Sequence, residues 1–398
     1  HDSFARSAVK MATGSGKTKV MALVLAWQYF NAVKENDKLY SKDFLIIAPN
    51  VIVYDRLKTD FENGIIFKTD PIIPTHLKIF WDFNFYTRDD FSRPDAIGNC
   101  YLTNIQQLYE KKDNVVNQAD PLEELLGEEP DFNLLDKSPI KNLLLNSKNK
   151  LSIINDEAHH TWDEENAWNK TIRYFNKSNK IIHQFDFSAT PRFSKGKLFS
   201  WVVYDYPLKQ AILDNIVKKP IKGFAKIPEG KSQVASIRYS GFLTAGVERW
   251  KEYQNNLNKL KKKPILFVMM HTQLEADDVA DWLRKKFPKD FSGDKTLVIH
   301  TDKSGEISKK DLDKSRQLAR DVDKDTSNVN AIVSVLMLRE GWDVQNVTVV
   351  IGLRPYTATT NILPEQTIGR GLRLMFRNES DYQERVDIIG NNALLKVC

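Results

Sequence analysis

The sequence predicts an α/β protein of two domains, each a mostly parallel sheet with helices on both faces. Continuous apolar, β-branched runs alternate with helical stretches along most of the chain, which is typical of strands that are buried on both faces. Two sets of such runs flank an irregular stretch from about residue 205 to residue 263. The 398 residues allow two or three domains at roughly 100–200 residues per domain.

The first half of the chain contains four of the predicted strands. The first ends at Met11 and leads through the turn Gly14-Ser15-Gly16 into a predicted helix from Lys17 to Lys34. The other three cover residues 44–48, 151–155 and 181–187. Residues 111–150 are rich in Asp, Asn and Lys, and we interpret them as a polar surface insertion.

The second half repeats this pattern. Its predicted strands cover residues 265–270, 296–300, 331–336 and 347–353. The regular pattern breaks near Tyr206 and Pro207. We therefore expect a first domain over residues 1–205, a connecting segment over 206–263 and a second domain over 264–398.

Composition excludes some classes of protein. The hydrophobic content of 41% and the charged content of 28% are ordinary for a globular enzyme. No apolar run approaches the ~20 residues of a membrane span, and no secretory signal is visible. The two cysteines, Cys100 and Cys398, form neither a disulfide framework nor a metal cluster pattern, which favours the cytoplasm. The net charge of +6 permits a polyanionic partner without requiring one.

A glycine-rich loop carries the first chemical signal. After a strand, the run Met11-Ala12-Thr13-Gly14-Ser15-Gly16-Lys17-Thr18 offers backbone N–H groups that can surround phosphate oxygens. We expect Gly14, Ser15 and Gly16 to line the phosphates, Lys17 to supply a positive charge and the Thr18 hydroxyl to hold Mg²⁺. The strict phosphate-loop pattern has glycine where this chain has Met11.

A second signal follows the strand at 151–155, where the chain reads Asp156-Glu157-Ala158-His159. Carboxylates at the carboxyl end of a parallel strand lie where open α/β sheets bind ligands. We expect Asp156 to bind Mg²⁺ and Glu157 to polarise the attacking water as a general base. A strand-capping Asp-Glu pair is the alternative, and the glycine-rich loop argues against it.

These segments, in this order, resemble motifs of superfamily 2 helicases. The loop at Met11–Thr18 resembles motif I, the Asp156–His159 box motif II, Ser188-Ala189-Thr190 motif III, and the run from Gln366 to Arg373 motif VI. The resemblance implies two RecA-like domains with ATP in the cleft between them and nucleic acid across their tops. It implies a coupling role for Ser188 and Thr190, and a catalytic role for Gln366, Arg370 and Arg373, with both arginines directed at the γ-phosphate.

A narrower resemblance is to the Res subunit of type III restriction enzymes. It is carried by the segments Leu338–Asp343, Glu365–Arg373 and His300–Ile307. It implies that Gly341 and Asp343 lie near the nucleotide, and that Ser334 contacts nucleic acid or couples it to ATP. It also implies duplex DNA as the partner and admits a methyltransferase subunit as a second one.

Further nucleic-acid contacts are expected at segments that resemble motifs Ia, Ib and IV. The residues are Asn50, Arg56, Thr103, Asn104 and Thr272. Such groups bind phosphates without reading sequence. Helix capping by Asn50, Asn104 and Thr272 is an equally good interpretation. For the aromatic residues between Phe80 and Tyr86, packing is favoured over base stacking.

The sequence therefore predicts an ATP- and Mg²⁺-dependent motor that translocates on DNA as part of a type III-like restriction enzyme. The chain begins without Met and ends about 25 residues after Arg373, so we expect a fragment whose nuclease domain, if there is one, lies outside it. One alternative is a helicase of repair or RNA metabolism that separates strands. Another is a nucleotide-gated DNA-binding switch with few ATP turnovers.

Overall fold

The computed structural model contains two compact units, His1–Ala12 with Gly16–Pro207, and Thr13–Ser15 with Leu208–Cys398. The structure describes residues 4–87, 95–105, 108, 149–160, 167–176, 180–193, 197–223, 227, 229–300, 321–335, 344–353, 369, 371–376 and 382–390. Within these residues, no helix is long and apolar enough to cross a membrane.

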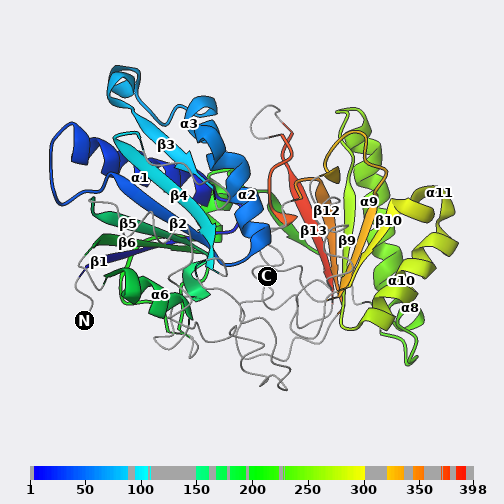
Figure 1. The fold of residues 1–398 in the computed structure, drawn as a ribbon. Helices are drawn as coiled ribbons and strands as arrows, with labels where there is room; N and C mark the ends of the chain where they lie inside the picture. Colours follow the sequence, from blue (N-terminus) through cyan, green and yellow to red (C-terminus); the bar gives the residue numbers. More distant parts are fainter. Residues whose placement is uncertain are drawn as a thin grey trace. The chain divides into compact units, whose positions relative to one another are not determined.

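The first unit is built on a sheet of seven strands in the order β3-β4-β2-β5-β6-β1-β7 (Figure 1). All neighbouring strands are parallel. The strands are β1 (Ala5–Met11), β2 (Asp43–Ala48), β3 (Phe83–Tyr86), β4 (Gly98–Asn104), β5 (Leu151–Asp156), β6 (Ile181–Ser188) and β7 (Val202–Tyr206). The helices are α1 (Lys17–Val33), α2 (Val51–Phe61), α3 (Ile65–Thr69) and α6 (Ala167–Asn176), with short 3-10 turns η1 (Glu62–Gly64), η2 (Thr75–Phe80) and η5 (Ala158–His160).

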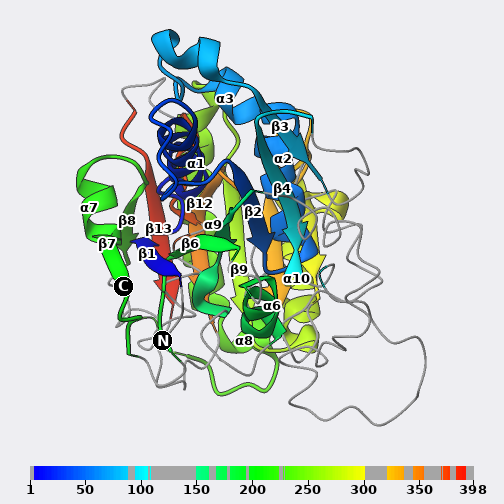
Figure 2. The ribbon, with the colours of Figure 1, turned by 60° about the vertical axis from the view of Figure 1, so that its left-hand side comes forward.

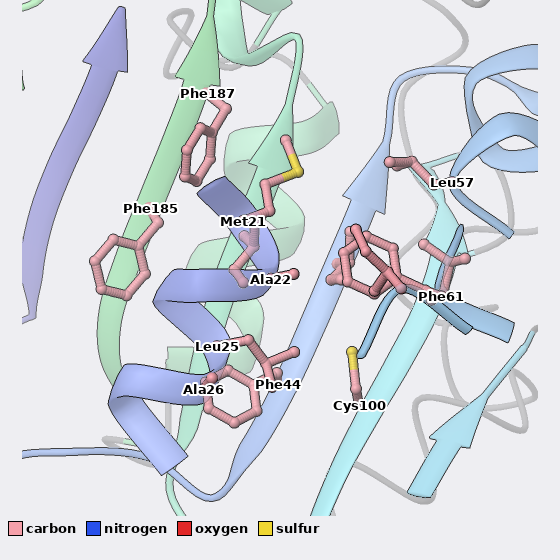
Figure 3. Packing of buried hydrophobic residues seen from close by; sticks show 14 of the residues in the cluster. Met21, Ala22, Leu25, Ala26, Phe44, Leu57, Phe61, Cys100, Phe185 and Phe187 are labelled. Carbon is pink, nitrogen blue, oxygen red and sulfur yellow. The ribbon is translucent and has the colours of Figure 1, made fainter. Parts of the chain in front are cut away.

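Helices cover both faces of this sheet because its strands are apolar on both sides. On one face, Met21 and Leu25 of α1 pack with Phe44 of β2 and with Phe185 and Phe187 of β6 (Figure 3). On the opposite face, Trp168, Ile172 and Phe175 of α6 pack against Leu45, Ile47 and Ile153. The apolar runs that predicted the strands thus form two separate cores.

Of the aromatic residues near β3, Trp81, Phe83 and Phe85 belong to the first of these cores and Tyr86 belongs to the second, whereas Phe80 is exposed. Trp81 stacks on Phe83 with ring centroids 4.8 Å apart, and the edge of Tyr29 meets both rings at 5.0 and 5.3 Å. The Tyr29 hydroxyl donates a hydrogen bond to the carbonyl oxygen of Phe80 at 2.8 Å. These contacts support packing rather than base stacking as the role of the cluster.

The second unit contains a sheet of six parallel strands in the order β10-β11-β9-β12-β13-β8. The strands are β8 (Lys219–Lys222), β9 (Ile265–Met270), β10 (Thr296–Ile299), β11 (Ala331–Val335), β12 (Val347–Gly352) and β13 (Arg385–Gly390). The helices are α7 (Leu208–Leu213), α8 (Ala235–Arg238), α9 (Ser240–Asn258), α10 (Gln273–Lys286) and α11 (Pro288–Phe291), with the 3-10 turn η6 (Gly293–Lys295).

One face of this sheet is covered by α9, α10 and α11. Leu243, Val247 and Trp250 of α9 and Val279 of α10 pack with alternate residues of β9, β11 and β12. The short helix α8 lies against α10, as both views show (Figures 1 and 2). Two parallel α/β sheets confirm the predicted fold class.

The segment expected to be a connection, residues 206–263, differs from that expectation. It supplies β8 to the second sheet and α9 to its core. Its helix is amphipathic, because Leu243, Val247, Trp250 and Leu257 recur on one buried face. Short, polar β8 has no continuous apolar run that would mark it as a strand.

A fully buried lysine ties β8 to β12. The Lys218 ammonium donates hydrogen bonds to the carbonyl oxygens of Gln345 at 2.5 Å and Val347 at 2.6 Å. Burial lowers the pKa of Lys218 from 10.5 to about 8, although Glu384 and Asp323 act in the opposite direction. With a pKa of about 8 the ammonium is still the main form at pH 7, and the folded chain loses this proton at a lower pH than the unfolded chain does.

This pKa predicts a pH-dependent stability. Between pH about 8 and 10.5 the unfolded chain binds more protons at Lys218 than the folded one, so the free energy of unfolding rises with pH in this window. In the variant Lys218→Met this contribution to the rise in the free energy of unfolding is absent, because methionine does not titrate. Urea unfolding of the wild type and of Lys218→Met across this pH window gives the free energy of unfolding of each. The difference between the two isolates Lys218, because all other groups titrate in both proteins. Equal slopes in the two proteins would contradict the assignment.

Candidate nucleotide site

The candidate site lies at the carboxyl edge of the first sheet. Because all of its strands are parallel, the segments that follow β1, β2, β4, β5 and β6 emerge at the same edge. Register supports this: Ala48 at the end of β2 pairs with Asn104 of β4, and Asp156 at the end of β5 pairs with Phe187 of β6. The parallel topology thus gathers residues that are far apart in sequence.

Two glycines of the loop after β1 have a left-handed backbone. Gly14 and Gly16 have φ angles of 82° and 93°, in the left-handed region that favours glycine. Gly16 is the N-cap of α1 and therefore has no side chain to cap the helix, and the first turn contains no acidic residue. The 17-residue helix thus presents the positive end of its dipole at the loop, where an anion such as phosphate is stabilised.

Lys17 lies between the two carboxylates of the second motif. Its ammonium donates a hydrogen bond to Glu157 Oε1 at 2.5 Å and lies 3.8 Å from Asp156 Oδ1. The Lys17 side chain is 8% exposed, that of Asp156 is 0% exposed and that of Glu157 is 14% exposed. The positive charge of Lys17 is thus paired with carboxylates, and a phosphate group that binds nearby would compete with them for the ammonium.

Arg56 of α2 neutralises the other side of Asp156. Its guanidinium forms an ion pair with Asp156 Oδ2, and the N–H of Glu157 donates to Asp156 Oδ1 at 3.0 Å. Burial raises the pKa of Asp156, whereas the charges of Arg56 and Lys17 counteract this rise. Sequence reasoning assigned Arg56 to nucleic acid and missed this pairing, for which the sequence carries no signal.

Glu157 has a positive φ of 49°, which is uncommon for a residue other than glycine. Backbone strain of this kind persists where surrounding contacts hold it, and it concentrates at functional sites. Here the side chain is held by Lys17 at one oxygen, and His159 Nδ1 lies 3.6 Å from the other. The general-base candidate is thus held by Lys17 at one oxygen and lies beside the imidazole of His159 at the other.

His159 continues the network to β6. Its Nδ1 is 3.1 Å from the hydroxyl oxygen of Ser188, and the same oxygen accepts a hydrogen bond from the N–H of Thr190 at 3.0 Å. Polar contacts therefore run from Lys17 through Glu157 and His159 to Ser188 and Thr190. We expected a coupling role for the last two. The histidine that joins them was part of the motif, and its role was missed.

The structure also places the expected nucleic-acid residues. Asn50 is the N-cap of α2, accepting a hydrogen bond from the N–H of Val53 at 3.0 Å, and Thr272 caps α10 in the same way through Glu275 at 3.2 Å. Capping is therefore confirmed for both. Asn104 ends β4 and is buried together with Thr103. The residues that directly follow Ile105 lie outside the described part of the chain, so a capping role for Asn104 stays a prediction. Ser334 is buried in β11.

Several predicted residues lie outside the described part of the chain. These are Gly341, Asp343, Gln366 and Arg370. Arg373 lies within the described segment 371–376 of the second unit. The roles expected for all of them, and for contacts with nucleic acid, stay predictions.

Oxygen donors at this edge suit a hard cation. Asp156 provides a buried carboxylate and Thr18 a hydroxyl at the start of α1, and Mg²⁺ takes such ligands together with phosphate oxygens. Among the described residues, no group of three or more His, Cys, Asp or Glu side chains forms a metal cage. A cation held by one or two protein groups and a bound phosphate fits these side chains.

Comparison with known proteins agrees with this geometry. Residues 2–193 match the family model described as type III restriction enzyme, res subunit. The EcoPI Res subunit of Escherichia phage P1 is 27% identical over 185 residues, and the EcoP15I Res subunit of Escherichia coli is 26% identical over 181 residues. Each match covers 42% of this chain and 18% of the relative, so the chain spans less than a fifth of their length.

Solved structures show the same fold. A fragment of a putative HsdR subunit of a type I restriction enzyme from Vibrio vulnificus has a TM-score of 0.53 and 16% identity, covering 98% of this chain and 60% of that one. A variant of Saccharomyces cerevisiae Dbp5 bound to RNA and ADP BeF3 has a TM-score of 0.50 and 11% identity, covering 100% of this chain and 82% of that one. The two parallel α/β units thus have the RecA-like fold of these proteins.

The ion pair between Arg56 and Asp156 makes a testable contribution to stability. Replacing Arg56 with Met leaves a buried carboxylate short of one cation, and we expect a loss of about 2–4 kcal/mol in the free energy of unfolding. In the double variant Arg56→Met with Asp156→Asn, we expect much of this loss to be recovered, because the buried charge is gone.

Urea denaturation measures four proteins: the wild type, Arg56→Met, Asp156→Asn and the double variant. The matched control is Lys58→Ala, which removes the more exposed pair with Glu62 on the same helix and should cost about 0–1 kcal/mol. A loss at Arg56 no larger than the loss at Lys58, or strictly additive losses in the double variant, would contradict the importance of the pair.

Proposed function

We propose that this chain is an ATP-dependent motor that acts on duplex DNA, because residues 2–193 match the family model described as type III restriction enzyme, res subunit. The observation that carries the proposal is the neutralised acidic pair, with Lys17 on Glu157 and Arg56 on Asp156, beside the open N-terminus of α1. These groups are those that bind a nucleoside triphosphate and direct water at it.

In the proposed reaction, the N–H groups of Gly14–Lys17 and the Lys17 ammonium bind the β- and γ-phosphates. Thr18 and Asp156 hold Mg²⁺, which neutralises charge on the phosphate oxygens when bound. Glu157 polarises the attacking water and takes up its proton. Gln366, Arg370 and Arg373 complete the site, and the two arginines stabilise the charge of the transferred phosphoryl group.

The network through His159 suggests how hydrolysis is linked to nucleic acid. His159 Nδ1 lies 3.6 Å from Glu157 Oε2 and 3.1 Å from the Ser188 hydroxyl oxygen, so the imidazole is next to both the general-base candidate and β6. A change in the position of Ser188 or Thr190 would thus be transmitted to Glu157 through the side chains of Ser188 and His159. We propose this route as the coupling between ATP turnover and contacts at the same sheet edge.

DNA is proposed because the curated relatives are restriction-modification enzymes. A neighbour in fold is bound to RNA, so a helicase that acts on RNA or separates strands is the second candidate. A binding switch with few turnovers is the third. A methyltransferase subunit as partner, and a nuclease domain elsewhere in the full protein, belong to the proposal by analogy with the same relatives.

The first test measures ATP turnover with Mg²⁺, alone and with duplex DNA, single-stranded DNA or RNA. We expect stimulation by duplex DNA, and a loss of roughly 10²–10⁴-fold in Glu157→Gln because the general base is removed. The control Glu62→Gln, at an exposed glutamate that directly follows α2, should retain the wild-type rate.

Each other result has a defined meaning. Stimulation by RNA or single strands alone would favour the helicase. A few turnovers per binding event would favour the switch. Turnover that survives in Glu157→Gln would contradict the assignment of the base.

A further inference from the structure

A buried glutamate holds the segment that follows Arg373. Glu384, which is 7% exposed, precedes β13. Its Oε2 accepts a hydrogen bond from the N–H of Met375 at 2.7 Å, and its Oε1 accepts one from the N–H of Phe376 at 2.9 Å. Each carboxylate oxygen thus binds one of two successive backbone amides, two and three residues after the arginine. Charge-assisted bonds of this kind are stronger than neutral ones.

Leu372, the residue before Arg373, is hydrogen-bonded to the start of β8, which is itself hydrogen-bonded to Glu384. The carbonyl oxygen of Leu372 accepts a hydrogen bond from the N–H of Lys218 at 2.6 Å, and the N–H of Lys219 donates to the carbonyl oxygen of Glu384 at 3.0 Å. The chain on both sides of Arg373 is therefore tied to the adjacent starts of β8 and β13. These strands pair in register, with Arg385 beside Lys219.

The Lys218 side chain extends this support to a third strand. Its two bonds to the carbonyl oxygens of Gln345 and Val347 link the start of β8 to the start of β12. Asp323 in turn accepts hydrogen bonds from the N–H groups of Gln345 and Asn346 at 2.7 and 3.0 Å. The segment of Arg373 thus rests on a buried polar network within the second unit rather than on apolar packing alone.

We propose that Glu384 is a positioning residue for Arg373, a role that rests on the proposed ATPase function. By fixing the backbone at Leu372 on one side and at Met375 and Phe376 on the other, the network restricts where the guanidinium can go. An arginine that is ordered in advance stabilises a developing charge without the cost of ordering it during the reaction. Both oxygens of Glu384 are required, because each binds a different amide.

The substitution Glu384→Gln tests this directly. The side-chain amide keeps one acceptor oxygen and turns its NH2 group toward the other backbone N–H, so one of the two bonds is lost. We expect kcat for ATP to fall about 10-fold, with KM for ATP changed by less than about 2-fold. Glu384→Asp, which keeps both oxygens, should have a higher kcat than Glu384→Gln. The control Glu252→Gln, an exposed glutamate on α9, should leave kcat unchanged.

A double-mutant cycle separates positioning from general support of the fold. In an Arg373→Ala background, Glu384→Gln should lower kcat no further, because the arginine that it positions is gone. Equal losses in the two backgrounds would overturn the proposal, as would an unchanged kcat in the single variant.

Hydrogen–deuterium exchange gives a readout that does not need turnover. In Glu384→Gln the amides of Met375 and Phe376 should exchange faster than in the wild type, while the amides of β9 keep their protection. Unchanged exchange at Met375 and Phe376 would overturn the proposal. If the wild-type chain hydrolysed no ATP with any nucleic acid, the proposed motor function would fail, and exchange would still decide whether Glu384 holds this segment.

Discussion

The candidate site depends on the neutralisation of two adjacent acidic residues at the end of a buried strand. Asp156 is fully buried and Glu157 has a left-handed backbone, and neither arrangement is stable without partners. Lys17 from the first loop and Arg56 from α2 supply the positive charge. Three segments of the first unit, at Lys17, Arg56 and Asp156, are thereby joined by ion pairs. We propose that a phosphate and its cation bind there.

This arrangement links fold and chemistry. The parallel sheet delivers the carboxyl ends of its strands to one edge, so the loop after β1 and the carboxylates after β5 meet there. In the proposed function, a nucleotide replaces the internal ion pair between Lys17 and Glu157 with one between Lys17 and phosphate, so binding competes with a contact already made. The chain from Glu157 through His159 to Ser188 carries such a change toward β6.

The strands with long apolar runs and the short motifs at the sheet edge could be predicted from the sequence. The long apolar runs, such as Phe44–Ala48 and Ile265–Met270, are strands because they are buried on both faces. Sequence reasoning missed β3, β4, β7, β8 and β13. The edge strands β3, β7 and β8 are short and partly exposed. Strand β4 contains Asn99, a residue type typical of loops, whose side-chain amide donates a hydrogen bond to Asp43 in the folded chain. Polar pairings such as Arg56 with Asp156, and Glu384 with two backbone amides, depend on tertiary contacts that no local pattern encodes.

The central claim is that the cations on the acidic pair mark a nucleotide site. It is tested most directly by a crystal structure of the chain with Mg²⁺ and a non-hydrolysable ATP analogue. The account predicts that the Lys17 ammonium leaves Glu157, from which it is 2.5 Å away, and lies about 3 Å from a phosphate oxygen, with the metal beside Asp156. A nucleotide bound elsewhere, with Lys17 still on Glu157, would contradict it.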